Sequence, residues 1–247
     1  MLFLIPIITF FIYLSIFMFI DKRDKEPISN IIFTCLYGMF VALFVCRYIL
    51  IGSSLYNISF VEEVIKFLIV IVCYNSLSKS VNNFLDLIIY SCYSSLGFAL
   101  AESLYYLYLN PSLSIAFSRS IYGFLHCIWI SMTAYGFRLS IKRSNPIYTF
   151  IGLSIAVLLH TLHNYLVIYS FNIEYTFLFI LELFGFLIMV NKEVYKEVSI
   201  IDNYRKNNKD SCLDNSQVLE LYELELKNKY ISSRLEQIYA FTKSFFK

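Results

Sequence analysis

Four groups of polar residues lie inside apolar stretches of the chain or at their ends. They are Glu62-Glu63-x-x-Lys66, Phe98-Ala99-x-x-Glu102, Arg119 with His126, and His160-x-x-x-Asn164. An ionisable side chain in the hydrocarbon of a bilayer costs at least a few kcal/mol, and such residues usually serve a function. Four groups that can converge indicate a catalytic site within a membrane.

These residue types are suited to amide hydrolysis. The adjacent carboxylates of Glu62 and Glu63 raise each other's proton affinity, while Lys66 can keep one of them ionised, so either glutamate could be a general base that activates water. His126 and His160 could stabilise an oxyanion, protonate a leaving amine, or bind a metal together with a carboxylate.

Purely structural roles remain open for the same side chains. Glu62 and Lys66 could form only an interfacial ion pair, and Glu102 and Arg119 only a buried structural pair. His126 could donate to a backbone carbonyl of a facing helix. The occurrence of all these groups at similar depth favours the catalytic interpretation.

Two further polar residues lie in the last two apolar stretches. We expect His163 to bond a backbone carbonyl. Glu182 is expected to be paired, protonated or lining a cavity, and the sequence assigns it no function.

The composition is that of a membrane protein. Hydrophobic residues make up 58% of the chain and charged residues 15%, whereas about a quarter of a soluble domain is charged. Seven apolar stretches are long enough, or nearly so, to span a bilayer as helices. They are residues 1–20, 28–52, 61–78, 84–109, 113–138, 146–170 and 175–191. The sequence therefore predicts an all-α, polytopic transmembrane bundle of about seven spans.

Charge in the connections predicts the orientation of this bundle. Lys and Arg occur in every second connection and in the tail, but not in the alternate connections 53–60, 110–112 and 171–174. Basic segments stay in the cytoplasm, so the N-terminus should be outside and the C-terminus cytoplasmic. We expect a transmembrane domain over 1–191 and a cytoplasmic tail over 192–247, whose residues 217–246 form an amphipathic helix that rests on the membrane or binds a partner.

The polar groups should lie at one level of the bilayer. A helix rises about 1.5 Å per residue, which places them between the outer surface and the middle of the membrane. Within each stretch their spacings of three, four or seven residues put them on one helix face. Gly97, Ala99 and Ala101 would let a second helix approach closely.

Other classes of protein find no support. The chain has no H-E-x-x-H, no G-x-G-D and no phosphate-binding loop, and its six cysteines include no C-x-x-C pair. The net charge of +2 implies no nucleic-acid partner. A transporter would be expected to show paired Gly- or Pro-interrupted spans in two related halves, and none is evident.

The order E-E-x-x-K, F-A-x-x-E, R-x6-H and H-x3-N resembles the PrsW family of membrane proteases over about residues 55–170, and through it the larger CPBP clan. That clan includes the CAAX prenyl endopeptidases and bacteriocin-immunity proteins. The resemblance implies an active-site set and a supporting set. The active-site set is Glu62, Glu63, Glu102, His126 and His160, and the supporting set is Lys66, Arg119 and Asn164.

The cofactor is left open by this resemblance. A divalent metal such as zinc would have His126, His160 and Glu63 as its ligands, and otherwise a glutamate alone would activate water. The chain departs from the family pattern at Ser103, where Asn usually follows the glutamate, and at Phe67, where Trp often follows the lysine.

The function implied by the resemblance is regulated proteolysis in a bacterial cytoplasmic membrane. The expected partner is a single-span membrane protein such as an anti-sigma factor, which receives its first cut on the extracytoplasmic side before a second protease releases the sigma factor. The alternative is a membrane immunity or scaffold protein of the same clan that retains these residues without proteolysis.

Overall fold

A computed structural model describes most of the chain as helices. It describes residues 1–21, 25–48, 54–77, 84–169, 172–207, 213–215, 217–219, 221–222 and 224. The helices are α1 (Leu4–Ile20), α2 (Ile28–Tyr48), α3 (Leu55–Ser76), α4 (Phe84–Leu109), α5 (Leu113–Arg143), α6 (Ile147–Ile168) and α7 (Asn172–Asn207). The described residues contain no strand, which confirms the all-α prediction.

The helices follow the predicted apolar stretches, with the largest differences in α3 and α7. Helix α3 begins at Leu55 rather than at residue 61, because Ser54 caps it by accepting a hydrogen bond from the Asn57 amide at 3.3 Å. Helix α7 continues past residue 191 to Asn207, since the Lys, Glu and Arg residues that recur after the apolar stretch are themselves good helix formers.

Several helices are suited to a bilayer. Within the described residues, four are long and apolar enough to cross a membrane: α4, α5, α6 and the segment Ile173–Asn207 of α7. Leu4–Ile20 and Ile28–Phe44 are shorter apolar helices. Helix α3 is continuous, but its apolar sequence is interrupted by Glu62, Glu63 and Lys66. These helices support a multi-pass membrane protein, while the count of seven spans stays a prediction.

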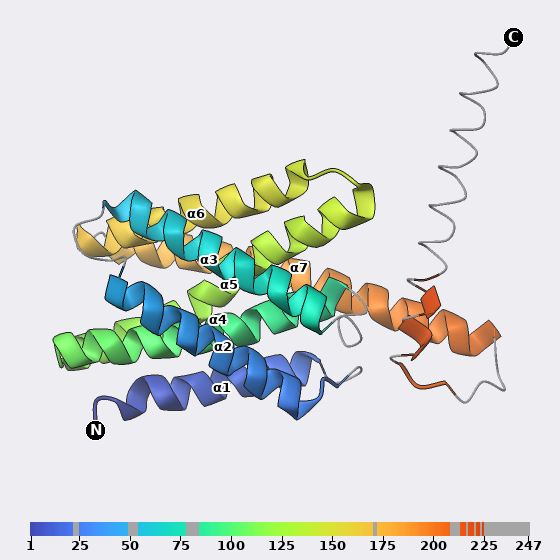
Figure 1. The fold of residues 1–247 in the computed structure, drawn as a ribbon, viewed down its shortest axis with the longest axis horizontal. Coiled ribbons are helices and arrows are strands. Elements are labelled where there is room, and N and C mark those ends of the chain that lie inside the picture. The colour runs from blue at the N-terminus through green and yellow to red at the C-terminus, as the bar shows by residue number, and fades with distance from the viewer. Residues whose placement is uncertain are drawn as a thin grey trace, which may run out of the picture. The chain divides into compact units, whose positions relative to one another are not determined.

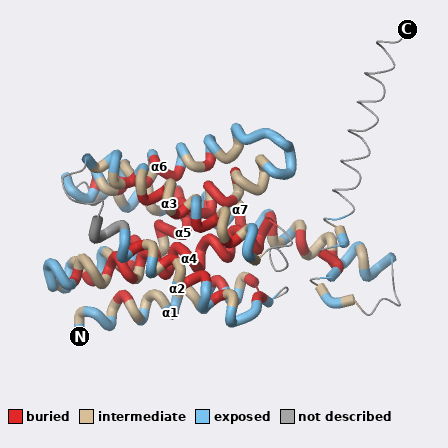
Figure 2. Tube along the Cα trace, viewed as in Figure 1, coloured by how far each residue is buried: buried red, intermediate tan, exposed pale blue. Residues whose placement is uncertain are grey.

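Helix α4 is the centre of the first compact unit, residues 1–192. It packs against α1, α2, α3 and α5, and α5 in turn packs against α6. Helices that follow one another in the chain run in opposite directions, so α2 and α4 run the same way, and the buried residues concentrate along α4 and α5 (Figures 1 and 2). Nearly all of α4 is buried, so it is enclosed by other helices rather than exposed to lipid.

Glycines bring the backbones of two helix pairs into contact. A Cβ atom on Gly97 would lie 2.0 Å from the Cys35 carbonyl oxygen of α2, and one on Gly38 would lie 1.9 Å from the Ser94 carbonyl oxygen of α4. The predicted close approach is thus confirmed at Gly97. Between α5 and α6, a Cβ on Gly136 would lie 2.4 Å from the carbonyl oxygen of Tyr148.

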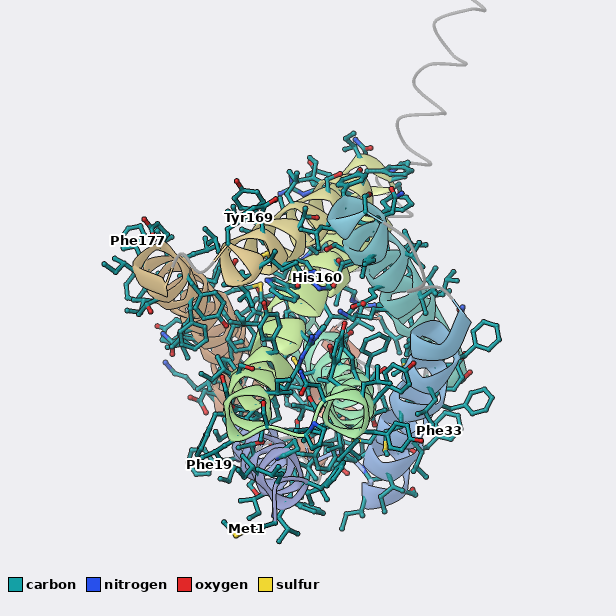
Figure 3. The ribbon with its side chains drawn as sticks, turned by 90° about the vertical axis from the view of Figure 1, so that its left-hand side faces the viewer. Met1, Phe19, Phe33, His160, Tyr169 and Phe177 are labelled. Atoms are coloured by element: carbon teal, nitrogen blue, oxygen red, sulfur yellow. The ribbon has the colours of Figure 1, made fainter. Side chains whose placement is uncertain are left out.

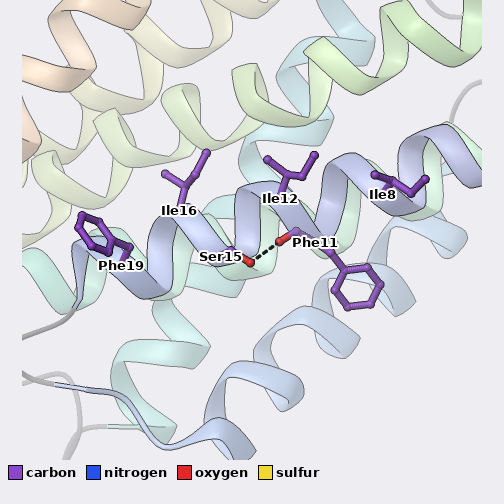
Figure 4. Close-up of a pocket in the computed structure, with 6 residues that line it drawn as sticks. All are labelled: Ile8, Phe11, Ile12, Ser15, Ile16 and Phe19. Atoms are coloured by element: carbon purple, nitrogen blue, oxygen red, sulfur yellow. Dashed lines mark hydrogen bonds between the residues drawn. The ribbon is translucent and has the colours of Figure 1, made fainter.

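The outer surface of the first unit is apolar. Helix α1 carries an open depression of ≈ 610 Å³ (Figure 4), lined by Ile8, Phe11, Ile12, Ser15, Ile16 and Phe19. The one hydroxyl in this lining, that of Ser15, donates to the Phe11 carbonyl at 2.8 Å. Because its only side-chain polar group is satisfied inside the helix, this face suits contact with lipid.

The second unit comprises residues 193–247. Its described part has a small core of Ile201, Val218 and Leu219. Asp214 accepts a hydrogen bond from the Gln217 amide at 2.8 Å, and the Gln217 side chain accepts one from the Asp214 amide at 3.0 Å. This reciprocal pair is a helix-capping arrangement. The rest of the predicted helix over 217–246 lies largely outside the described residues.

The contact between α2 and α4 predicts a stability difference between two glycine substitutions. Gly97→Ala should lower the free energy of unfolding by about 1–3 kcal/mol, because the new methyl group overlaps a backbone carbonyl that cannot move independently. Gly185→Ala in α7 is the matched control, since a Cβ there would meet nothing within 4 Å. Thermal unfolding of both variants in detergent tests this, and equal stability would contradict the α2–α4 packing.

Candidate active site

The antiparallel course of α3 to α6 brings the predicted residues to one level. Glu62 and Glu63 lie in the first half of α3, and His126 lies in the first half of α5. Glu102 lies towards the end of α4 and His160 in the second half of α6. Because successive helices alternate in direction (Figure 1), the beginnings of two helices meet the ends of the other two.

The residues that meet there are enclosed by the bundle. The exposed fractions are 2% for Glu62, 0% for Glu63, 1% for Lys66, 4% for Glu102, 0% for His126 and 3% for His160. His160 lies inside the bundle in the view along the helices, whereas Phe33 and Phe177 point outward (Figure 3). Buried ionisable groups are tolerated only where partners replace water, and these groups partner one another.

Glu63 is the most heavily bonded carboxylate of the site. Its Oε1 atom accepts hydrogen bonds from the Lys66 ammonium at 2.6 Å and from Nδ1 of His160 at 2.9 Å. Lys66 also lies over the ring of Phe98, from the F-A-x-x-E motif, with 4.9 Å between Nζ and the ring centroid. One carboxylate oxygen thus connects α3 to α6, and Phe98 adds a cation–π contact from α4.

Lys66 also fixes the tautomer of His126. The lysine Nζ atom lies 2.6 Å from Nδ1 of His126. A charged ammonium has only donors, so Nδ1 is the acceptor and the ring proton is on Nε2. That Nε2 atom lies 3.1 Å from Oε2 of Glu102. His126 therefore stands between a cation and a carboxylate.

Glu102 connects this interior to the rim of the site. Its Oε1 atom accepts a hydrogen bond from Arg119 at 3.1 Å. The Arg119 side chain is 19% exposed and stacks on Tyr106 with 3.6 Å between Cζ and the ring centroid. The structural ion pair considered for Glu102 and Arg119 is present, and the same carboxylate also faces His126.

Glu62 has the fewest partners of the three carboxylates. Its Oε2 atom lies 3.8 Å from Nε2 of His160. Within the described part of the chain, that oxygen makes no hydrogen bond, and neither does Oε2 of Glu63. A buried carboxylate oxygen without a donor is costly, so these two atoms are the natural contacts for a substrate, a water molecule or a cation.

The charges of the site leave room for a cation. Three carboxylates (62, 63 and 102) face two permanent cations, Lys66 and Arg119, which gives a formal charge of −1 when both histidines are neutral. A proton or a metal ion would offset it. Glu62, Glu102 and His126 offer ligand atoms that all lie within 4.8 Å of one another.

These three residues fit a divalent ion after a small contraction. Zinc bonds of about 2.1 Å in a tetrahedral site would bring ligand atoms to about 3.4 Å from one another. The ion would need the lone pair on Nε2 of His126, so the ring proton would move to Nδ1 and Lys66 would turn away or lose its proton. Of the ligands predicted from sequence, only His126 belongs to this group, since Glu63 and His160 bond to each other.

Asn164 is close to the site but bonds a residue that the sequence analysis missed. Its amide donates to the Ser59 hydroxyl at 3.1 Å. Ser59 is fully buried and lies one helical turn before Glu62 and Glu63 on α3. That spacing was the available signal for Ser59. Asn164 therefore supports the α3–α6 contact rather than reaching the carboxylates directly.

Trp129 is the other residue that the sequence analysis missed. Its ring stacks on His160 with 4.3 Å between centroids and 17° between planes, and its spacing of three from His126 was the available signal. Its indole nitrogen donates to Glu182 at 3.3 Å. The expectation that Glu182 is paired is thus confirmed.

The expectation for His163 is wrong. Its Nε2 atom lies 3.0 Å from the Glu182 carboxylate, and among the described residues its Nδ1 atom has no partner. A carboxylate from the next helix replaces the carbonyl that we expected.

The Lys66–Glu63 pair predicts a large loss of stability on removal of its cation. Lys66→Met should lower the free energy of unfolding by about 3–5 kcal/mol, because it leaves the Glu63 carboxylate without its cation in an apolar interior. Lys196→Met is the matched control: Lys196 and Glu193 have the same spacing, but the lysine side chain is 36% exposed, so the loss should be about 0.5 kcal/mol or less. Chemical unfolding in detergent measures both, and similar losses would contradict burial of the pair.

Comparison with known proteins agrees with this geometry. The model of the PrsW family intramembrane metalloproteases matches residues 26–191, which is more than half of the 247-residue chain and includes every residue of the site. No curated protein and no solved structure matched. The matched segment supports a protease activity in a multi-pass membrane protein. By its sequence over α2 to α7, the chain belongs to the PrsW family of intramembrane metalloproteases.

Proposed function

We propose that this protein is an endopeptidase that cuts a membrane-anchored protein at the outer side of a bacterial cytoplasmic membrane. The observation that carries the proposal is the meeting of all five predicted active-site residues with Lys66 in one buried cluster. Family membership supplies the reaction class.

The side chains suggest a division of roles. Glu62 is the candidate general base, because its Oε2 atom makes no hydrogen bond within the described chain and faces Nε2 of His160 at 3.8 Å. Glu63 orients His160 by accepting the Nδ1–H bond. His126, held between Lys66 and Glu102, is the candidate group to stabilise an oxyanion or to protonate the leaving amine.

A metal would change the roles of the carboxylates. If zinc binds Glu62, Glu102 and His126, it would polarise the scissile carbonyl and make water a better nucleophile. Glu63, which retains a free Oε2 atom, would then be the carboxylate left to accept a proton. The two schemes predict different consequences for the same variants.

The substrate is proposed to approach from outside. The helix ends nearest the site lie at the segments 53–60, 110–112 and 171–174, which carry no Lys or Arg and include the first turns of α3 and α7. The absence of basic residues is the reason we expect these segments to be extracytoplasmic. A single-span protein cut near its outer juxtamembrane segment fits this position, and a membrane-anchored anti-sigma factor is the proposed example. A prenylated tail presented from the cytoplasm does not fit it.

The first functional prediction is loss of cleavage in active-site variants. Glu63→Gln and His126→Ala should each abolish cleavage of co-expressed membrane-anchored anti-sigma factors, because each removes a group of the buried cluster. Immunoblotting of membrane fractions measures the substrate fragments. Glu174→Gln is the control, since it makes the same chemical change at an exposed carboxylate in the first turn of α7.

Cleavage by both active-site variants at the wild-type rate would remove these residues from the mechanism. No cleavage of any candidate by a folded, inserted wild-type protein would favour the immunity or scaffold function. Equal cleavage by wild type and Glu174→Gln is required for the comparison to hold.

A second functional prediction concerns the metal. The purified protein should bind zinc, and Glu62→Gln should lose the ion while Glu63→Gln retains it, because only Glu62 belongs to the Glu62–Glu102–His126 group. Elemental analysis of the purified variants measures this without any substrate. Metal-free protein whose cleavage resists a chelator would contradict zinc and favour Glu62 as the base.

A further inference from the structure

The single tryptophan of the chain forms one wall of the active site. Trp129 is fully buried. Its ring stacks face to face on His160 with 4.3 Å between centroids, and its edge meets His126 at 5.2 Å. The Lys66 ammonium lies 5.8 Å from the same ring. Trp129 thus contacts both histidines of the site, although it carries no group that titrates.

The opposite edge of the indole is held by a second buried polar pair. The Trp129 Nε1–H group donates to Oε2 of Glu182 at 3.3 Å, and the same oxygen lies 3.0 Å from Nε2 of His163. Glu182 is 4% exposed and His163 is fully buried. Tyr175 packs edge-on against the His163 ring at 5.0 Å. Trp129 lies on α5, His163 on α6, and Tyr175 and Glu182 on α7.

The lipid-facing surroundings of Glu182 leave its carboxylate few places to find hydrogen-bond donors. Its neighbours on α7, Leu181 and Phe184, are 56% and 66% exposed, so they face lipid. A carboxylate costs several kcal/mol in hydrocarbon unless donors replace water. Glu182 therefore turns inward, where its carboxylate contacts the indole of Trp129 and the imidazole of His163.

The stacked indole supplies a restraint that the polar contacts of His160 lack. The hydrogen bond from Nδ1 to Glu63 fixes one atom of the ring but leaves the ring plane free to tilt. Face-to-face stacking fixes the plane, and it leaves Nε2 of His160 directed to Glu62 at 3.8 Å. The position of the indole depends in turn on the acceptor that holds its N–H group.

We propose that Glu182 is a positioning residue, which together with His163 holds Trp129 against His160 and so sets the orientation of His160 for the reaction. The catalytic part of this inference rests on the proposed protease function. Its structural part, the connection from α7 through Trp129 to His160, is independent of any substrate.

The structural part can be tested by magnetic resonance in detergent micelles. A sample labelled with ¹⁵N-tryptophan gives one indole signal, because Trp129 is the only tryptophan, and a sample labelled with ¹⁵N-histidine reports three rings. Loss of a ring signal in His160→Gln assigns His160. Glu182→Leu should shift the indole signal and the His160 signals, whereas Glu174→Gln on the same helix should shift neither.

The catalytic part is tested with the same variants. Glu182→Leu should lower kcat roughly 10–100-fold, as is typical when a group that orients an active-site ligand is removed, with KM little changed because Glu182 does not contact substrate. Glu182→Gln should recover most of the activity, since its amide oxygen can still accept the indole N–H bond. Trp129→Phe keeps a stacking ring without that bond and should fall between the two.

Two outcomes would overturn the inference. One is an unchanged indole or His160 signal in folded Glu182→Leu, and the other is an unchanged kcat in that variant despite shifted signals. Failure of Glu182→Gln to rescue would also contradict the role of Glu182 as a hydrogen-bond acceptor. Absence of cleavage by wild type would refute the protease function instead, and the shifts of the indole and His160 signals would still decide the structural part.

Discussion

The interaction on which the site depends is the sharing of one buried carboxylate between two partners. Glu63 is fully buried and accepts hydrogen bonds from Lys66 and His160 through a single oxygen. In an apolar bundle each of these groups would be costly alone, and removing one leaves another uncompensated. The position of Nδ1 of His160 and the contact between α3 and α6 follow from this arrangement, and the same Lys66 ammonium sets the tautomer of His126.

The packing of the bundle makes such short distances possible. Helix α4 is enclosed by its neighbours, and Gly38 and Gly97 allow its backbone to touch that of α2. Glycine is required there because any Cβ atom would overlap a carbonyl oxygen. Close packing of α4 brings Glu102 towards His126, and Arg119 then offsets the charge of Glu102 at the rim. Backbone contact and electrostatics therefore support the same geometry.

A second group of polar contacts lies behind the first. Trp129 separates His160 from the pair formed by His163 and Glu182, and it contacts both sides. Histidines in active sites are commonly oriented by a partner that does not touch substrate. Here one face of the His160 ring is held by the stacked ring of Trp129 rather than by a hydrogen-bonding group. The orientation of His160 therefore depends on Glu182 of α7, which accepts the hydrogen bond of that indole.

The sequence by itself determined the helices, the membrane environment, the family pattern and the ionisable residues of the candidate site. Hydropathy and helical spacing are local properties, so they identify which residues share a face and which segments suit a bilayer. Only the tertiary structure decided that Glu63 bonds Lys66 and His160, that Glu62 and Glu102 join His126 as candidate ligands, and that Trp129 and Ser59 belong to the site. Which residues of different helices meet depends on how far each helix is rotated and how deep it lies. Both are set by packing between helices, which cannot be read from the sequence of one segment.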